Sequence, residues 1–127
     1  MLVSGLLSPD WPPGRVVDLL LRGGIVLCFD DRVLAEYRRV LARPKFGFDP
    51  AHVREILDYL QAEGEATSAA PLNIELPDPD DRAFLEVAVA AGAEFLITGN
   101  LKHFPAALRR GADLVVPGEF LEKHWQS

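Results

Sequence analysis

The segment Pro71–Asn100 constrains the fold of this 127-residue chain more than any other stretch. In it, a cluster of aspartates opens an apolar helix, and that helix leads into a short apolar strand ending at Thr98-Gly99-Asn100. Open α/β sheets bind their ligands at the carboxyl ends of parallel strands, so we expect the acidic side chains near such an edge. Carboxylates beside a buried surface are costly unless a cation lies among them. The segment therefore predicts an α/β fold with a divalent-metal site.

Apolar strand candidates alternate with helical patterns along the chain. The clear strands are Ile25–Phe29 and Glu94–Thr98, with weaker candidates at Asp113–Val116 and, as an edge strand, at Leu72–Leu76. Apolar spacing, capping residues and terminal glycines predict helices at Gly14–Arg22, Asp31–Ala42, Pro50–Ala62, Asp81–Ala91 and Gly118–Lys123. This alternation predicts a parallel sheet covered on both faces. Proline and glycine punctuate the elements without marking a linker, so we expect residues 1–127 to form a single domain.

The charge balance argues against a broad electrostatic grip on nucleic acid, because 19 acidic residues stand against 13 lysines and arginines and give a net charge of −6. It does not exclude a nucleic-acid enzyme, since an acidic site becomes locally cationic once it holds a metal ion. We interpret the clustered basic residues as solvated helix faces. One cluster is Arg38, Arg39, Arg43 and Lys45, and the other is Arg109 and Arg110.

The single cysteine, Cys28, excludes an internal disulfide and is compatible with a reducing compartment. Its place in an apolar strand favours packing over nucleophilic work. No apolar run approaches the ~20 residues of a membrane span, and the first residues lack the basic start of a secretion signal. We therefore expect a cytoplasmic protein with no membrane contact.

Helical phase separates the acids of the predicted helix Asp81–Ala91. At about 100° per residue, Asp81 falls inside the apolar arc, whereas Glu86, near ~140°, points away from it. We expect Asp81 to face the core or a cleft at its edge, and Glu86 to face solvent. Helix capping is the alternative, because Asp78, Asp80 or Asp81 could accept backbone N–H bonds at the helix start. One aspartate suffices for a cap, and three are present.

Glu36 is the second candidate ligand. It stands one turn from Val33 and from Val40, on the flank of the apolar stripe of its helix, where a carboxylate can face a neighbouring helix. The alternative is a surface glutamate paired with Arg32 or Arg39.

Polar residues also follow the predicted strand Glu94–Thr98. Thr98 and Asn100 stand at its end, where side chains commonly meet a ligand, although Gly-Asn is also a strong turn signal. His103 is a lone histidine in the next loop, and such a residue is more often merely exposed. With no second histidine or cysteine at ligand spacing, we expect no zinc site.

Together these residues resemble the PIN-domain family, and within it the ribonuclease toxins of bacterial toxin–antitoxin pairs. The similarity covers nearly the whole chain in the expected order, and no single motif carries it. The matching stretches are Leu2–Pro9, Leu34–Gly47, Asp78–Ala88, Leu96–Pro105 and Gly118–Leu121.

The resemblance implies a three-layer α/β/α fold around a central parallel sheet, with an acidic pocket that holds Mg²⁺ or Mn²⁺ for the hydrolysis of single-stranded RNA. Glu36 matches the family's helix glutamate and Asp81 its later aspartate, so both would be metal ligands, with Asp78 as a further candidate. Asn100 stands where many members place another acid, and Thr98 matches the threonine beside it. We expect the catalytic set to be Glu36, Asp81, Asn100 and Thr98. The implied partner is a cognate antitoxin protein, and a homodimer is compatible with the resemblance.

One departure concerns the start of the chain. Family members begin with an apolar strand ending in Asp-Thr-Asn, immediately before the segment matched by Leu2–Pro9, whereas Met1 stands right after that position. The resemblance therefore implies that the first, central strand and its catalytic aspartate are missing. Losing about four buried side chains at ~1.5–3 kcal/mol each would cost on the order of 6–12 kcal/mol, against a typical domain stability of ~5–15 kcal/mol. We expect poor folding unless another segment or a partner chain fills the gap.

Three hypotheses follow for function. The favoured one is a metal-dependent endoribonuclease, the toxin half of a toxin–antitoxin pair. Because the remaining site residues are undamaged, we expect its natural start to lie further upstream. A genuine truncation would instead give a weakened or inactive relative of the family. The second hypothesis is a catalytically inactive PIN-like module that acts through protein contacts. The third, an aspartate-based phosphotransfer domain, needs a nucleophilic aspartate at the end of a central strand, which neither clear strand candidate supplies.

Overall fold

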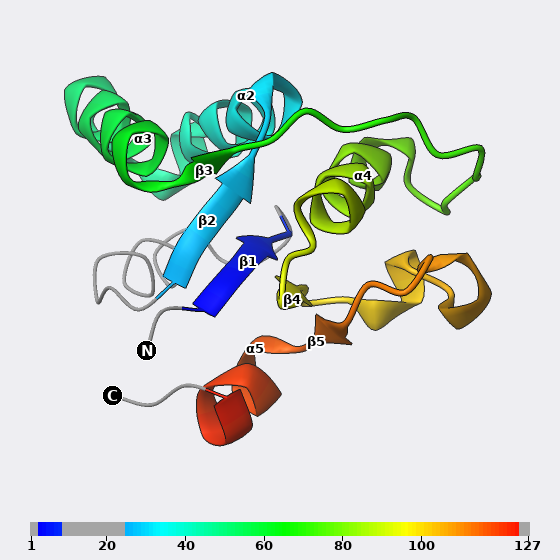
Figure 1. Ribbon diagram of the computed structural model, residues 1–127. Helices are drawn as coiled ribbons and strands as arrows, with labels where there is room; N and C mark the ends of the chain where they lie inside the picture. Colours follow the sequence, from blue (N-terminus) through cyan, green and yellow to red (C-terminus); the bar gives the residue numbers. More distant parts are fainter. Residues whose placement is uncertain (1–2, 9–24, 125–127) are drawn as a thin grey trace.

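Five parallel strands form one sheet in the order β3-β2-β1-β4-β5. The computed structural model describes residues 3–8 and 25–124, and Figure 1 shows the sheet with the helices packed around it. The strand order changes direction at β1, which has β2 on one side and β4 on the other. The predicted α/β class with a parallel sheet is therefore confirmed. The strands are β1 (Val3–Leu7), β2 (Ile25–Phe29), β3 (Glu65–Ala66), β4 (Phe95–Ile97) and β5 (Leu114–Val115).

Within the described residues, the helices that pack on this sheet are α2 (Asp31–Leu41), α3 (Pro50–Glu63) and α4 (Arg82–Ala91). The α3 helix lies against α2 near β2, and α4 packs on β1, β2 and β4 (Figure 1). Short turns complete the chain as 3₁₀ helices η1 (Pro44–Phe46), η2 (Pro79–Asp81), η3 (Leu101–His103) and η4 (Ala106–Leu108), followed by α5 (Pro117–Glu119) and the π-helix η5 (Phe120–His124). The helices predicted after residue 30 are confirmed, and the one predicted at Gly14–Arg22 lies outside the described residues.

The helix boundaries follow from capping residues. The Asp30 side chain accepts a hydrogen bond from the Val33 amide at 3.0 Å and starts α2. The Asp49 side chain does the same for α3 through the Ala51 amide at 2.9 Å. At the end of α4, Gly92 adopts φ 62°, a left-handed conformation that glycine reaches without strain.

The centre of the sheet is occupied by β1. Leu6 and Leu7 are fully buried there, and the strand pairs in register with both of its neighbours. The resemblance implied a gap at this position unless another segment filled it, and Val3–Leu7 fills it. This apolar stretch satisfies the backbone hydrogen-bonding groups of β2 and β4, so the sheet is continuous across its middle.

Tyr37 of α2 fixes the carboxyl end of β1. Its hydroxyl donates to the Leu7 carbonyl at 2.6 Å and accepts from the Leu7 amide at 3.2 Å. Burial raises the pKa of Tyr37, so the hydroxyl keeps the proton that it donates. The next residue, Ser8, is fully buried, and its amide continues the ladder by donating to the Ile97 carbonyl at 2.7 Å. The end of the central strand is therefore held by both α2 and β4.

The predicted edge strand at Leu72–Leu76 is wrong. This segment is irregular, and the edge of the sheet is β3, where Glu65 pairs with Cys28 of β2. Ile74 and Leu76 are nevertheless buried, because the segment packs onto the hydrophobic core without pairing with a described strand. The alternating apolar residues of Leu72–Leu76 thus predicted burial correctly but did not predict backbone pairing.

Cys28 packs in the core, as its place in an apolar strand predicted. It is fully buried, and burial raises the pKa of its thiol to about 11, with Glu65 adding to the shift. The thiol therefore stays protonated near neutral pH and is a poor nucleophile. In the described part of the chain, no helix has the length and apolar character needed to cross a membrane.

Candidate functional site

Three side chains from two separate segments converge at the start of α4. Asp78, Asp81 and His103 each offer one ligand atom, and these atoms all lie within 4.8 Å of one another. Asp81 is only 3% exposed, and its Oδ2 lies 3.1 Å from Nδ1 of His103. We call the surrounding hollow of about 130 Å³ the acidic cleft, which is lined by Glu36, Arg39, Val40, Arg43, Asp78, Asp80, Asp81 and His103.

The 3₁₀ turn η2 sorts the three aspartates into different roles. Asp78 is the cap, because its Oδ1 accepts from the Asp80 amide at 3.0 Å. Asp81 closes the turn, with its amide donating to the Asp78 carbonyl at 3.1 Å, and within the described residues its side chain makes no capping bond to α4. Asp80 is exposed, whereas Asp81 is buried. One aspartate thus caps the turn and leaves the Asp81 carboxylate directed into the cleft.

Glu36 reaches the same cleft from α2. Its side chain is 16% exposed and forms an ion pair with Arg39, whose Nε donates to Oε2 at 3.3 Å and whose second nitrogen contacts Oε1. The hydrogen bond with Glu36 raises the pKa of Arg39, and the charges of Asp80 and Asp78 add to the shift. The structure therefore brings Glu36 and Asp81 to one cleft, as expected, but Glu36 is held by an arginine and lies outside the three-residue cluster.

Thr98 and Asn100 make turn contacts just after the end of β4. Thr98 is fully buried, and its Oγ1 accepts from the Asn100 amide at 3.1 Å. The Asn100 Oδ1 accepts from the Lys102 amide at 3.1 Å and caps η3, whose last residue is His103. Neither Thr98 nor Asn100 is among the described residues that line the acidic cleft. Their contacts therefore position His103.

His103 is the site residue that sequence reasoning undervalued. Its side chain is 31% exposed and contacts the most buried carboxylate of the cleft. The available signal was its position shortly after β4, on the turn that begins at Asn100, because ligands of open α/β sheets gather beyond strand ends. Its partner Asp81 lies far back in the sequence, so spacing alone gave no indication of the contact.

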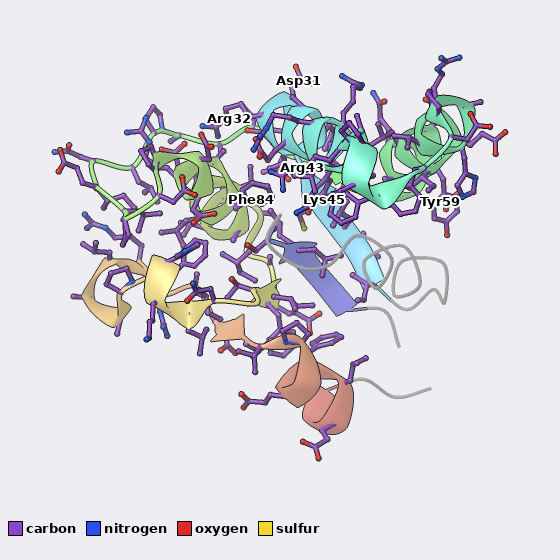
Figure 2. All side chains as sticks on the ribbon, turned by 180° about the vertical axis from the view of Figure 1, so that it is seen from behind. Asp31, Arg32, Arg43, Lys45, Tyr59 and Phe84 are labelled. Carbon is purple, nitrogen blue, oxygen red and sulfur yellow. The ribbon has the colours of Figure 1, made fainter. Side chains whose placement is uncertain are left out.

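The expectation that Glu86 faces solvent is wrong. Glu86 is 2% exposed and contacts Arg32 at 2.6 Å and Arg82 at 3.5 Å, while the Leu72 amide donates to its Oε2 at 2.7 Å. Figure 2 shows Arg32 at the start of α2, on the side toward α4. Helical phase counted this side of α4 as free, but Arg32 and the irregular segment around Leu72 cover it. Glu86 therefore fastens α2, α4 and that segment together.

Electrostatics agree with a charged Glu86. Burial alone raises the pKa of this carboxyl, but the hydrogen bonds from Arg32 and from the Leu72 amide, with the charges of Arg32 and Arg82, outweigh burial and hold the pKa below its usual range. A buried carboxylate whose oxygens already accept several hydrogen bonds stabilises the fold and is not available to bind a metal ion.

The donor set of the acidic cleft fits a divalent cation. Carboxylate oxygens are the ligands that Mg²⁺ and Mn²⁺ prefer, and the imidazole nitrogen of His103 suits a transition ion. Ligand atoms within 4.8 Å of one another are close enough to surround one ion. With a single histidine and no cysteine in this cluster, the set differs from a structural zinc site.

Comparisons with known proteins agree with this architecture. The family model described as PIN domain matches residues 1–102. One similar solved structure is the crystal structure of VapBC2 from Rickettsia felis bound to a DNA fragment from their promoter, with a TM-score of 0.52 and 17% sequence identity over 90% of this chain and 98% of that chain. At this identity the similarity concerns the fold. No curated protein matches the chain significantly.

Proposed function

The chain belongs to the PIN-domain family, and we propose that it is a metal-dependent endoribonuclease that hydrolyses single-stranded RNA as the toxin component of a bacterial toxin–antitoxin pair. The observation that carries this proposal is the convergence of Asp78, Asp81 and His103 in one cleft. A buried carboxylate such as Asp81 is stabilised when a cation lies beside it. A divalent cation favours phosphodiester hydrolysis, because it offsets the negative charge of the phosphodiester and of the hydroxide that attacks it.

Asp81, Asp78 and His103 hold Mg²⁺ or Mn²⁺, which when bound supplies positive charge for the phosphodiester and favours deprotonation of water. Glu36 is a further catalytic carboxylate at the same cleft once Arg39 moves away from it. Thr98 and Asn100 are positioning residues, because their hydrogen bonds build the turn that carries His103.

The proposal includes a protein partner. The resemblance to toxin–antitoxin ribonucleases implies a cognate antitoxin. The similar solved structure, VapBC2 bound to a DNA fragment, supports an assembly of this kind. Cytoplasmic location and a homodimer belong to the same proposal.

A second candidate function is a catalytically inactive PIN-like module that acts through protein contacts. The end of the central strand favours it, because the residue after β1 is the buried Ser8 and not a carboxylate. Arg39 also covers Glu36. Fewer free carboxylates mean weaker binding of a hard divalent ion.

Cleavage of a fluorescently labelled single-stranded RNA with and without Mn²⁺ tests the proposal. The wild-type protein should cleave only with the ion, and Asp81→Asn should lose most of the rate, because a neutral amide replaces the buried carboxylate while the shape of the side chain is kept. Asp58→Asn, at an exposed position of α3, is the matched control and should cleave like the wild type. A folded wild-type protein that fails to cleave RNA at any Mn²⁺ concentration would favour the inactive module.

A further inference from the structure

A basic stretch follows the middle of α2 and runs past its end. Arg38, Arg39, Arg43 and Lys45 lie within eight residues of a chain whose net charge is −6. Figure 2 shows Arg43 and Lys45 near each other beyond the end of α2. Two of the four, Arg39 and Arg43, line the acidic cleft itself. The sequence alone favoured a solvated helix face for this stretch, but two of its residues also line the cleft, where they can contact a ligand.

Two aromatic rings continue the same stretch. Phe46 and Phe48 stack with ring centroids 6.2 Å apart and ring planes 27° from parallel. Lys45 places its Nζ 5.2 Å from the centroid of the Phe46 ring. Phe48 packs against the hydrophobic core, whereas Phe46 is half-buried and is not among the described residues of that core. Core packing therefore explains Phe48 but not Phe46.

The backbone holds these side chains in a fixed turn. The Phe46 amide donates to the Arg43 carbonyl at 3.1 Å, and the Gly47 amide donates to the Pro44 carbonyl at 3.1 Å. Gly47 has φ 63°, which lets the chain reverse immediately after Phe46. A binding surface that is already ordered loses little conformational entropy when a ligand arrives.

We propose that Arg39, Arg43, Lys45 and the Phe46–Phe48 pair form a platform for single-stranded nucleic acid beside the acidic cleft. Arginine and lysine side chains bind the phosphates that flank the cleavage position, and an unpaired base stacks on Phe46. This inference rests on the proposed function, because it names how the substrate of that site is held. Cations interleaved with a partly exposed aromatic ring such as Phe46 suit single strands, since every unpaired nucleotide presents a π-face and a phosphate.

The arrangement also resolves the conflict between an acidic chain and a polyanionic substrate. A small basic platform at the mouth of an acidic cleft attracts the phosphate backbone locally, although the chain as a whole carries a net charge of −6. A double helix has no free base face to offer Phe46, so the platform selects single strands.

Fluorescence anisotropy of a labelled RNA dodecamer, with Asp81→Asn as the parent protein so that cleavage does not intervene, tests the platform. Arg43→Gln and Lys45→Gln should each weaken binding about tenfold and reduce the slope of log Kd against log salt by about 0.7. Arg54→Gln, an exposed charge-matched position on α3, should bind like the parent. Platform variants that bind like Arg54→Gln would overturn the proposal.

Substitutions of Phe46 test the stacking contact separately. Phe46→Leu keeps an apolar side chain but loses the ring, so it should weaken RNA binding about tenfold. Phe46→Tyr keeps the ring and should bind RNA as tightly as the parent protein. A duplex of the same sequence should bind more weakly than the single strand. Equal binding by Phe46→Leu, or equal binding of the duplex, would overturn the stacking contact.

Comparison with single-stranded DNA shows which polymer the platform prefers. Equal affinity means that phosphate and base suffice, and tighter RNA binding adds a contact to the ribose hydroxyl; both outcomes agree with the platform. Failure of the platform and failure of the proposed function remain distinguishable. The platform fails when the variants bind RNA like their parent, and the nuclease fails when wild-type protein with Mn²⁺ binds RNA but leaves it intact.

Discussion

Nδ1 of His103 lies 3.1 Å from Oδ2 of Asp81, and this contact joins the turn after β4 to the start of α4. The two residues come from elements that are far apart in sequence, so only the fold brings them together. Because Asp81 is almost fully buried and His103 is partly exposed, the pair forms the inner wall and the mouth of one cleft.

His103→Ala should weaken Mn²⁺ binding by about tenfold or more, because a nitrogen ligand is lost while Asp78 and Asp81 remain. Calorimetric titration of the purified protein with Mn²⁺ measures this directly. His52→Ala, which removes an exposed histidine from α3, should leave the affinity unchanged. Equal Mn²⁺ affinity in His103→Ala and the wild type would remove His103 from the ligand set.

Glu86→Gln should lower the free energy of unfolding at pH 7 by about 1–3 kcal/mol, because the buried ion pair and its hydrogen bonds are weakened. The pKa of Glu86 is lower in the folded protein than its usual value of 4.5. The ionised Glu86 side chain therefore makes its full contribution to the free energy of unfolding above about pH 4.5. This contribution is lost as the pH falls below 4.5 and through the lower pKa of the folded state.

Urea unfolding at pH 7 and pH 3.5 checks the sign. The stability difference between wild type and Glu86→Gln should shrink at the lower pH, since the glutamine does not titrate. Glu55→Gln, on an exposed side chain of α3, serves as the control and should show little difference at either pH. A difference that grows on acidification would contradict a lowered pKa for Glu86.

Local sequence signals predicted the frame of this fold. Asp30, Asp49 and Gly92 marked helix ends through capping bonds and a left-handed φ that depend on neighbouring residues alone. The apolar runs that became β2 and β4 were equally visible, because burial on both faces leaves a continuous hydrophobic signature. Features that arise within a few residues are recoverable from a single chain.

The features that were missed arise between distant segments. Glu86 was assigned to solvent because helical phase describes one helix in isolation, whereas Arg32 and the Leu72 segment cover it. His103 gained its meaning only from Asp81. The position of β1 was missed because the same stretch, Val3–Leu7, was matched to the segment that follows the family's first strand, and pairing with two neighbours decided its conformation.

Gly5→Ala should destabilise the protein by about 1–3 kcal/mol, since a Cβ at this position would stand 3.0 Å from the Phe95 carbonyl oxygen of the neighbouring strand. Thermal unfolding followed by circular dichroism measures the effect. Gly118→Ala is the control, because a Cβ there meets no atom within 4 Å. A melting temperature unchanged by Gly5→Ala would mean that β1 does not pair closely with β4.

Arg39→Gln should have opposite effects on the binding of Mn²⁺ and of single-stranded RNA. It releases Glu36 from its ion pair and removes a positive charge beside Asp80 and Asp78, so Mn²⁺ should bind severalfold more tightly. The same change removes a phosphate contact, so single-stranded RNA should bind more weakly to the variant.

Parallel titrations with Mn²⁺ and with labelled RNA measure both effects on the same protein. Arg38→Gln is the matched control, because Arg38 is an exposed neighbour on α2 that does not line the acidic cleft. Tighter Mn²⁺ binding with weaker RNA binding would agree with an ion held among the carboxylates beside Arg39 and with Arg39 as a phosphate contact. A Mn²⁺ affinity that stays constant would contradict an ion bound close to Arg39 and Glu36.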